Sequence, residues 1–470
     1  MVGQRVDEVV ATGQAASLSE QLACYWSAAR FEDLPPEVVH AARRCLLDTV
    51  SAGVAGGRTD VVDTVSRAMA AGGSGPGDTV LWGRGDTLAP AAAALVNGTA
   101  AHALELDDFG GCGHSGAVVI PAVCALAQRY PVSGREAILA SAAGDELAGR
   151  VLEGSGGYRP HNERGWHSTG TCGSFGAAAA SAKLLKASPD EFTQALGIAG
   201  TFTGGTWAFL ADGALVKRFH PGKASETGVS AALLARAGLT GPRHVLDAKW
   251  GGFYSTYAPG VATPEKAVAG LGRDFHILNS GIKPYACCRT IHSVIDAVLE
   301  LVGSTGRSSE VERFIVHGNA QTKLQFERID VRNLLEAQFS MPYCLAVAAR
   351  SGRATLEQFE PLRIADPEIQ RLMMLTEIRT DRVLGRTDYP SLEVVFKGGE
   401  RILRDVPFAK GAPEAPVSDE ELVQKAKSLL VPVLGDAVTL RLIDGIFSLE
   451  GCADFSQLTR LLATSPKGTA

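Results

Sequence analysis

The 470-residue sequence lacks any apolar run long enough to span a bilayer, because Gly, Ser or a charge interrupts each stretch before the ~18 residues that a span needs. It also lacks a basic cluster: 45 basic residues face 51 acidic ones, a net charge of −6, which argues against nucleic-acid binding. The first residues, MVGQRVDEVVATGQ, are polar, so we expect no secretory signal. Nine cysteines without a framework spacing favour reduced thiols. These absences predict a soluble, cytoplasmic protein with no membrane or nucleic-acid partner.

Several motifs of nucleotide, metal and redox chemistry are also missing. There is no Walker A lysine, no G-x-S-x-G elbow and no C-x-x-C, and residues 170–176 are glycine-rich without the order of a dinucleotide-binding loop. His161 and His167 lie six residues apart, a weak spacing for metal ligands. Cys287 and Cys288 are adjacent and would form a strained ring, so two reduced thiols are favoured. We therefore predict neither a metal nor a nucleotide cofactor.

Helical patterns dominate up to about residue 275, after about 15 residues that we expect to be a loose tail. Residues 33–37 (DLPPE) lead into apolar residues spaced by three and four, with proline in the first turn. Further segments share this helical character: 134–153, 174–186, 189–200 and 222–237, the last rich in the small residues that allow tight helix packing. Capping boxes begin two helical regions, with Ser188 and Glu191 in one and Ser418 and Glu421 in the other.

The pattern changes after about residue 275. Residues 311–317 and 391–397 are rich in β-branched and aromatic residues, and the second run meets a Gly-Gly pair and a further short run, which signals a hairpin. Helical patterns alternate with these strands at 290–302 and 340–350. We therefore predict a mainly α fold, in which a large all-helical domain (residues 1–276 together with 409–470) carries an inserted, smaller α+β domain (residues 277–408).

Five short polar islands stand out from the apolar background. They cover residues 102–122 (HALELDDFGGCGHSGAVVIPA), 165–176 (GWHSTGTCGSFG), 216–224 (VKRFHPGKA), 282–292 (IKPYACCRTIH) and 338–344 (QFSMPYC). Three of them are expected to precede helices, whose N-termini favour anions. If the islands converge in the fold, they form a basic pocket with histidines, which suits a small polycarboxylate.

Such a pocket could remove a proton next to a carboxylate. The negative charge that then develops is stabilised by fixed cations and N–H donors, by roughly several kcal/mol in a water-poor site. A histidine can take or return the proton, which is worth ~10²–10⁴-fold in rate. Chain order alone does not show that the islands converge.

Each candidate residue also has a purely structural interpretation. His102 is favoured as a structural hydrogen-bonding residue on a helix, whereas His114 and His167 lie in polar Gly/Ser-rich loops and are favoured as functional. Asp107 and Asp108 could cap a turn, and Tyr343 could belong to the core. For Lys217 and Lys283, a surface role and a functional role are about equally supported.

The same islands resemble the signature segments of the MmgE/PrpD family, which includes 2-methylcitrate dehydratases, cis-aconitate decarboxylases and iminodisuccinate epimerase. The resemblance runs from about residue 17 to about residue 450 and is carried by GWHSTGTCGSFGAAAASAKLL, KRFHPGKASETGVSAALLARAGLTGP and KPYACCRTIHSVIDAVLEL in this order. It implies a cofactor-free homodimer with a large all-helical domain and a smaller α+β lid domain.

Matched motif by motif, the resemblance implies four catalytic residues: His114, His167, Lys217 and Lys283. The histidines would contact substrate or move protons, and the lysines would hold carboxylates; which histidine is the base stays open. We predict four further residues that bind substrate: Asp107, His220, Arg289 and Tyr343.

The sequence also departs from the family pattern at several positions. Glu105 stands where aspartate is usual, and Phe109-Gly110 replace a polar pair after the two aspartates. Ser115-Gly116 replace the usual Pro-Ser after His114, and decarboxylases of the family tend to carry a histidine near the position of Cys288. These changes are expected to reshape the wall that faces the substrate.

We predict a cofactor-independent lyase that abstracts a proton next to a carboxylate and eliminates water, or another leaving group such as phosphate, from a small carboxylic acid. The same carbanion chemistry supports two alternatives, an epimerase of an amino- or imino-dicarboxylate and a cis-aconitate-type decarboxylase. A non-catalytic relative that only binds a carboxylate ligand is a further alternative, against which the retained histidines and lysines argue.

Overall fold

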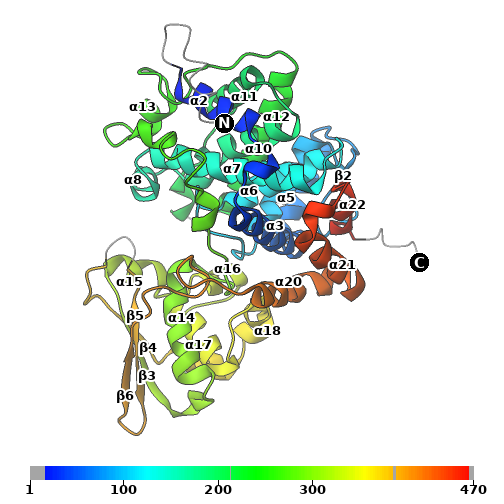
Figure 1. Cartoon of the computed structure of the whole chain (residues 1–470). Coiled ribbons are helices and arrows are strands. Elements are labelled where there is room, and N and C mark those ends of the chain that lie inside the picture. The colour runs from blue at the N-terminus through cyan, green and yellow to red at the C-terminus, as the bar shows by residue number, and fades with distance from the viewer. Residues whose placement is uncertain (1–15, 212, 385–387, 465–470) are drawn as a thin grey trace. The chain divides into compact units, whose positions relative to one another are not determined.

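The chain divides into two compact units (Figure 1) in a computed structural model that describes residues 16–211, 213–384 and 388–464. The first unit comprises Met1–Ser280 and Ser418–Ala470, and the second comprises Gly281–Val417. Helices far outnumber the short strands, so the predicted mainly α fold is confirmed. The tail expected at the first 15 residues lies outside the described residues.

The first unit is built from helices of one to six turns. Their bounds are α2 Leu18–Ala28, α3 Pro36–Gly56, α4 Asp60–Ala71, α5 Pro90–His102, α6 Ser115–Ala127, α7 Gly134–Gly154, α8 Tyr158–Glu163, α9 Ser168–Thr171, α10 Gly173–Leu184, α11 Pro189–Thr201, α12 Val216–Arg236, α13 Phe253–Tyr257, α20 Asp419–Leu434, α21 Asp436–Phe447 and α22 Ser456–Thr459. Two short antiparallel strands, β1 Thr79–Val80 and β2 Thr87–Leu88, complete it. Both predicted capping boxes are present, on α11 and α20.

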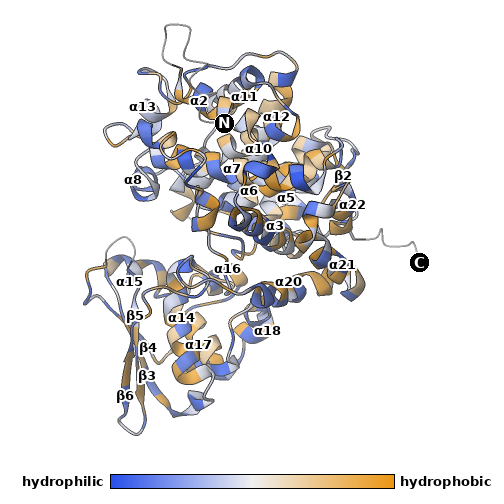
Figure 2. Cartoon of the chain, in the orientation of Figure 1, coloured by the Kyte–Doolittle hydropathy of each residue, from blue (hydrophilic) through white to orange (hydrophobic). Residues whose placement is uncertain are grey.

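The helices α5, α6, α7, α10 and α12 pack against one another at the centre of this unit (Figure 1). Helix α6 is apolar all round and fully buried, and it is drawn mostly in hydrophobic colours in Figure 2. Close approach depends on glycine: a Cβ at Gly222 of α12 would lie 2.1 Å from the Leu95 carbonyl oxygen of α5, and one at Gly228 would lie 2.3 Å from Ala177 of α10. The small residues predicted at 222–237 therefore serve tight helix packing.

Helix α12 begins earlier than expected. The island at 216–224 was expected to precede a helix, but α12 already starts at Val216 and contains Pro221. Proline removes one backbone donor and normally ends a helix, although it is tolerated near the N-terminus, where only the carbonyl four residues earlier loses its partner. Here that carbonyl belongs to Lys217, so the lysine and His220 lie on the first turns of the helix and not on a loop before it.

The second unit combines short helices with one mixed sheet. Its helices are α14 His292–Val298, α15 Ala320–Phe326, α16 Leu334–Gln338, α17 Met341–Ser351, α18 Pro361–Ile364 and α19 Pro367–Met373, and its strands are β3 Val311–His317, β4 Thr376–Arg379, β5 Ser391–Phe396 and β6 Arg401–Arg404. The strand order is β4-β3-β5-β6. Strand β3 is parallel to β4, with Phe314 opposite Thr376, and antiparallel to β5, with His317 opposite Ser391. The predicted β5–β6 hairpin is present.

After the second unit, the chain returns to the first through α20, which packs on α3. Lys425 of α20 donates to Asp48 Oδ1 of α3 at 2.5 Å and to the Leu106 carbonyl oxygen at 2.6 Å. A side chain from the end of the sequence thus holds the loop that follows α5.

Within the described residues, no helix combines the length and the hydropathy required to cross a membrane.

Candidate active site

The loop between α5 and α6 carries most of the first polar island. His102 ends α5, and His114 is the residue that caps the N-terminus of α6. Gly110 and Gly113 have φ values of 121° and 126°, which favour glycine, and their backbone N–H groups bond to each other's carbonyl oxygens at 3.1 and 2.7 Å. Glu105 also has a positive φ, 54°, although it has a side chain. This turn brings the loop back towards His102.

Two imidazoles meet at one carboxylate oxygen in this loop. Asp107 Oδ2 lies 2.8 Å from His102 Nδ1 and 3.1 Å from His114 Nδ1, and the two imidazole rings are 4.4 Å apart. His114 Nδ1 is also 2.7 Å from the Asp108 carbonyl oxygen. Because a carbonyl oxygen only accepts hydrogen bonds, Nδ1 of His114 must carry the proton. In the neutral ring, Nε2 is then the basic atom.

The adjacent carboxyl groups of Asp107 and Asp108 differ in charge. Burial alone would raise the pKa of Asp107, but the neighbouring His102 and His114 lower it well below its ordinary value, so this carboxylate is ionised. Burial, and then the charge of Asp107, raise the pKa of Asp108 well above its ordinary value. Asp108 accepts from the Gly116 N–H at 3.0 Å, which fixes the start of α6. The predicted capping role of Asp108 therefore fits this geometry.

Lys217 and Glu105 form a buried ion pair beside the two imidazoles. The Lys217 ammonium on α12 donates to Glu105 Oε1, and the same oxygen lies 3.9 Å from His102 Nε2. Glu105 is only 3% exposed. Burial lowers the pKa of His102 to about 4; the charges of Asp107 and Glu105 oppose this shift, whereas those of His114 and Lys217 add to it. His102 is therefore neutral near pH 7 and donates its Nδ1–H to Asp107.

A second pair of histidines lies nearby. His167 precedes α9, and its Nδ1 is 2.9 Å from Nδ1 of His220 on α12, while Trp207 packs edge-on against the His167 ring at 4.9 Å. Burial first, and then the charge of Lys217, lower the pKa of His167 well below its ordinary value and that of His220 to about 4. Both rings are neutral near pH 7, so one donates to the other.

The first unit thus brings together five of the eight predicted site residues: His114, His167, Lys217, His220 and Asp107. The two histidine pairs are close enough that a positive charge on either His102 or His114 lowers the pKa of His167. A Cβ at Gly113 would lie 2.6 Å from Thr169 Oγ1, two residues after His167. Two members of the cluster were not among the predicted site residues: His102, which we interpreted as structural, and Glu105, which we noted only as a departure from the family pattern.

The three remaining predicted residues belong to the second unit. The Tyr343 hydroxyl donates to the Gln358 carbonyl oxygen at 2.6 Å, and its ring packs against Phe359. Arg289 donates to the Ala409 carbonyl oxygen at 3.4 Å and lies over the Tyr389 ring. Lys283 lies in the segment before these residues and is buried. Their roles towards a substrate stay predictions.

His102, Asp107 and His114 are also the described residues whose ligand atoms could hold a metal ion, since these atoms lie within 4.8 Å of one another. Both Nδ1–H groups already point at Asp107, however, and a metal would require these nitrogens without their protons. The two Nδ1–H groups are therefore used by hydrogen bonds to the Asp107 carboxylate.

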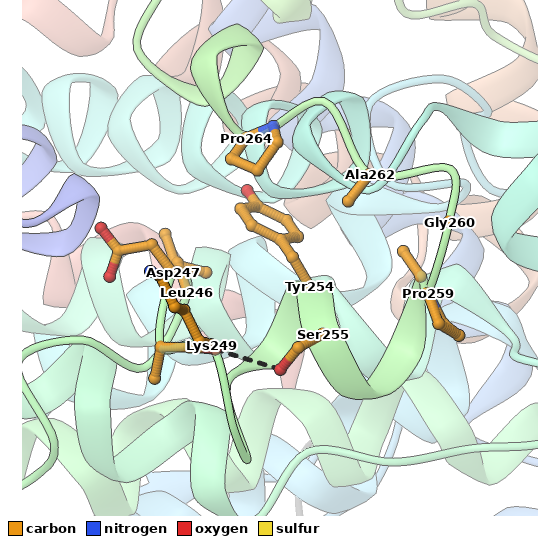
Figure 3. A pocket seen from close by; sticks show the side chains of 11 residues that line it. Leu246, Asp247, Lys249, Tyr254, Ser255, Pro259, Gly260, Ala262 and Pro264 are labelled. Atoms are coloured by element: carbon orange, nitrogen blue, oxygen red, sulfur yellow. Dashed lines mark hydrogen bonds between the residues drawn. The ribbon is translucent and has the colours of Figure 1, made fainter.

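A surface pocket of about 210 Å³ lies in another part of the first unit, along residues 246–264 (Figure 3). The Tyr254 ring forms part of its wall, and Ser255 Oγ donates to the Ala248 carbonyl oxygen at 3.1 Å. None of the predicted site residues lines this pocket.

Comparison with known proteins agrees with the resemblance. The model of the MmgE/PrpD N-terminal domain matches residues 20–265, and that of the C-terminal domain matches residues 285–447. A cis-aconitate decarboxylase-like protein of Aspergillus oryzae is 29% identical over 94% of this chain and 96% of its own length. The cis-aconitate decarboxylases of Aspergillus terreus and Homo sapiens are 27% and 28% identical, over 93% and 95% of this chain and 94% of their own lengths.

Proposed function

The chain belongs to the MmgE/PrpD family, and from this premise we propose that it is a cofactor-independent lyase acting on a small polycarboxylic acid. One observation carries the proposal: Asp107 and the Asp108 carbonyl fix the Nδ1–H of His114, which leaves Nε2 as the atom that exchanges a proton with the substrate. His114 is the less buried of the two histidines at Asp107 Oδ2, with 16% of its side chain exposed.

The neighbouring groups suit a substrate that carries negative charge. Lys217 provides a fixed cation within the cluster, and the neutral imidazoles of His167 and His220 can donate or accept hydrogen bonds without repelling a carboxylate. Charge that develops on the carbon next to a carboxylate would be delocalised into that carboxylate and stabilised by the ammonium group. By resemblance, Lys283 supplies a second such cation.

We rank the loss of CO₂ ahead of the loss of water, although the sequence alone favours the loss of water. The curated relatives reported above are named as cis-aconitate decarboxylases or decarboxylase-like, and each is covered over nearly its whole length. In this reaction CO₂ leaves while the electron pair of its former C–C bond stays on the substrate. His114, once it has taken up a solvent proton at Nε2, gives that proton to the carbon and returns to its neutral form. Dehydration stays the second candidate, because Cys288 stands near a position where decarboxylases of the family tend to carry histidine.

Proton NMR in D₂O with purified protein tests this proposal. With cis-aconitate, we expect new alkene signals from a product that has lost a carboxyl group and carries deuterium from the solvent. With 2-methylcitrate, a new alkene signal without loss of a carboxyl group would instead establish the dehydratase. Exchange of a hydrogen for deuterium without loss of atoms in either substrate would establish proton transfer but contradict the lyase.

A further inference from the structure

His102 lies between two carboxylates, one of which also binds a histidine and the other a lysine. Its Nδ1 is 2.8 Å from Asp107, which also holds His114, and its Nε2 is 3.9 Å from Glu105, which also holds Lys217. Nε2 of His102 is buried and has no hydrogen-bond partner among the residues that the structure describes. The groups therefore form a row in which nitrogen bases alternate with carboxylates, in the order Lys217, Glu105, His102, Asp107 and His114.

The weak point of this row is the 3.9 Å gap between Glu105 and His102. The Glu105 oxygen on the near side of this gap is the one that binds the Lys217 ammonium. A substrate carboxylate that binds Lys217 would compete with Glu105 for this cation. The displaced glutamate needs to move its oxygen by only about 1 Å to reach hydrogen-bond distance from Nε2.

We propose that Glu105 and His102 form a relay that couples the binding of a substrate carboxylate at Lys217 to the uptake of a proton by His102 Nε2. The proton comes from solvent, and the resulting imidazolium donates Nδ1–H to Asp107 and Nε2–H to Glu105. This relay rests on the proposed function, because it requires a carboxylate substrate at Lys217.

The charged groups around His102 act on its protonation in the direction that the relay requires. Asp107, Glu105, His114 and Lys217 all act on its protonation, and in the free protein burial and Lys217 keep it neutral. A carboxylate on Lys217 offsets the ammonium charge, and Glu105 then stabilises the protonated ring. Once His102 is charged, its positive charge offsets that of the Asp107 carboxylate. Asp107 then stabilises a protonated His114 less, which favours transfer of the His114 proton to the substrate. The substrate would thus activate the acid that acts on it.

Titration calorimetry with tricarballylate, a saturated tricarboxylate that offers no double bond or hydroxyl group for elimination, tests the relay without turnover. Binding is measured near pH 7 in two buffers of different ionisation enthalpy, which yields the number of protons taken up. For the wild type we expect uptake approaching about one proton per site. In Glu105→Gln and in His102→Asn, we expect binding with uptake close to zero. Glu226→Gln, which removes an acid paired with Lys223 on the same helix as Lys217, is the matched control and should keep the wild-type uptake.

The outcomes separate the relay from the proposed function. Binding to the wild type without proton uptake, or unchanged uptake in Glu105→Gln or His102→Asn, would overturn the relay and leave the polycarboxylate site standing. Absence of any binding to the wild type would contradict the polycarboxylate site, and the relay with it. Thermal melting of each variant establishes that a loss of uptake does not come from unfolding.

Discussion

Polar side chains are used differently in the two units. In the first unit, ionisable groups are aimed at one another: His102 and His114 share Asp107, Lys217 holds Glu105, and His167 meets His220. In the second unit, Tyr343 and Arg289 of the predicted site donate to backbone carbonyl oxygens of their own unit, those of Gln358 and Ala409. A backbone partner satisfies a buried polar group, whereas contacts between ionisable groups also couple their proton affinities. The comparison therefore supports the proposal that proton transfer takes place in the first unit.

The largest expected effect separates two histidines that are both held by an aspartate. His114 binds Asp107 in the first unit, and His317 Nδ1 lies 2.7 Å from Asp381 Oδ2 in the second. We expect His114→Ala to lower kcat by about 10²–10⁴-fold, because it removes the proton-transfer group, and His317→Ala to leave kcat nearly unchanged. Steady-state rates on the substrate found by NMR measure both. Equal losses in the two variants would contradict the comparison.

Replacing either of two buried aspartates by asparagine should change the free energy of unfolding near pH 8, but in opposite directions. Burial, and then the charge of Glu146, raise the pKa of Asp145 on α7 to about 7, so the native state holds this proton more tightly than the unfolded chain. The resulting stability is present at low pH and is lost as the pH rises from about 4 through 7. Asp145→Asn should therefore match the wild type near pH 4 and exceed its free energy of unfolding by up to about 4 kcal/mol near pH 8.

Burial also raises the pKa of Asp296 in the second unit. Asp296 is nevertheless the contrasting case, because hydrogen bonds from the Tyr285 hydroxyl and, at 2.7 Å, from the Lys410 N–H oppose this rise. Asp296→Asn should lower the free energy of unfolding at both pH values, by about 1–2 kcal/mol, since an amide is a weaker acceptor. Denaturant unfolding at the two pH values measures both variants. A pH-independent effect of Asp145→Asn would contradict the role of its ionisation.

Two glycines with positive φ test how tightly each unit packs its loops. Gly111 (φ 50°) lies in the loop before His114, and a Cβ there would be 2.2 Å from Ser115 Oγ; Gly399 (φ 84°) lies in the β5–β6 hairpin with nothing within 4 Å of its Cβ position. Gly399→Ala should cost about 1 kcal/mol, the strain of the left-handed backbone alone. Gly111→Ala should cost about 2–3 kcal/mol and also lower kcat. Thermal unfolding and kinetics check both; equal costs would show that the catalytic loop can yield.

The smallest expected effect concerns Tyr343, which we predicted to bind substrate. Its hydroxyl donates to the Gln358 carbonyl oxygen, so Tyr343→Phe leaves this buried oxygen without its donor. We expect a loss of about 1 kcal/mol in the free energy of unfolding and little change in KM. A large rise in KM with unchanged stability would instead support the substrate contact and weaken the contrast between the units.

Regular elements were predictable because their signals are local. Apolar spacing and capping boxes predicted α3, α7, α11 and α20, and the β-branched runs with a Gly-Gly pair predicted the β5–β6 hairpin. Pro221 hid the start of α12, because proline usually marks the end of a helical pattern.

The site was predictable only as a set of residue types. Histidines and lysines in polar islands indicated proton chemistry on a carboxylate, but the pairing of His102 with Asp107 depends on a turn in which Glu105 adopts a left-handed backbone. Glutamate gives no sequence signal for this conformation, unlike Gly or Asn. The contact between Glu105 and Lys217 joins residues 112 positions apart, which local spacing does not reveal. The homodimer, the cytoplasmic location and the roles of the second unit's residues stay predictions.

The contact of Lys425 with Asp48 and the Leu106 carbonyl has a consequence for the order in which the protein matures. On the ribosome, the histidines and aspartates of the cluster emerge more than 200 residues before the lysine that supports their loop. The whole second unit is translated in between. Until α20 emerges, Asp48 lacks this cation and the loop lacks this anchor. The site is therefore completed late in translation. A nascent chain stalled before residue 418 would carry the candidate catalytic groups without the Lys425 contact that supports their loop.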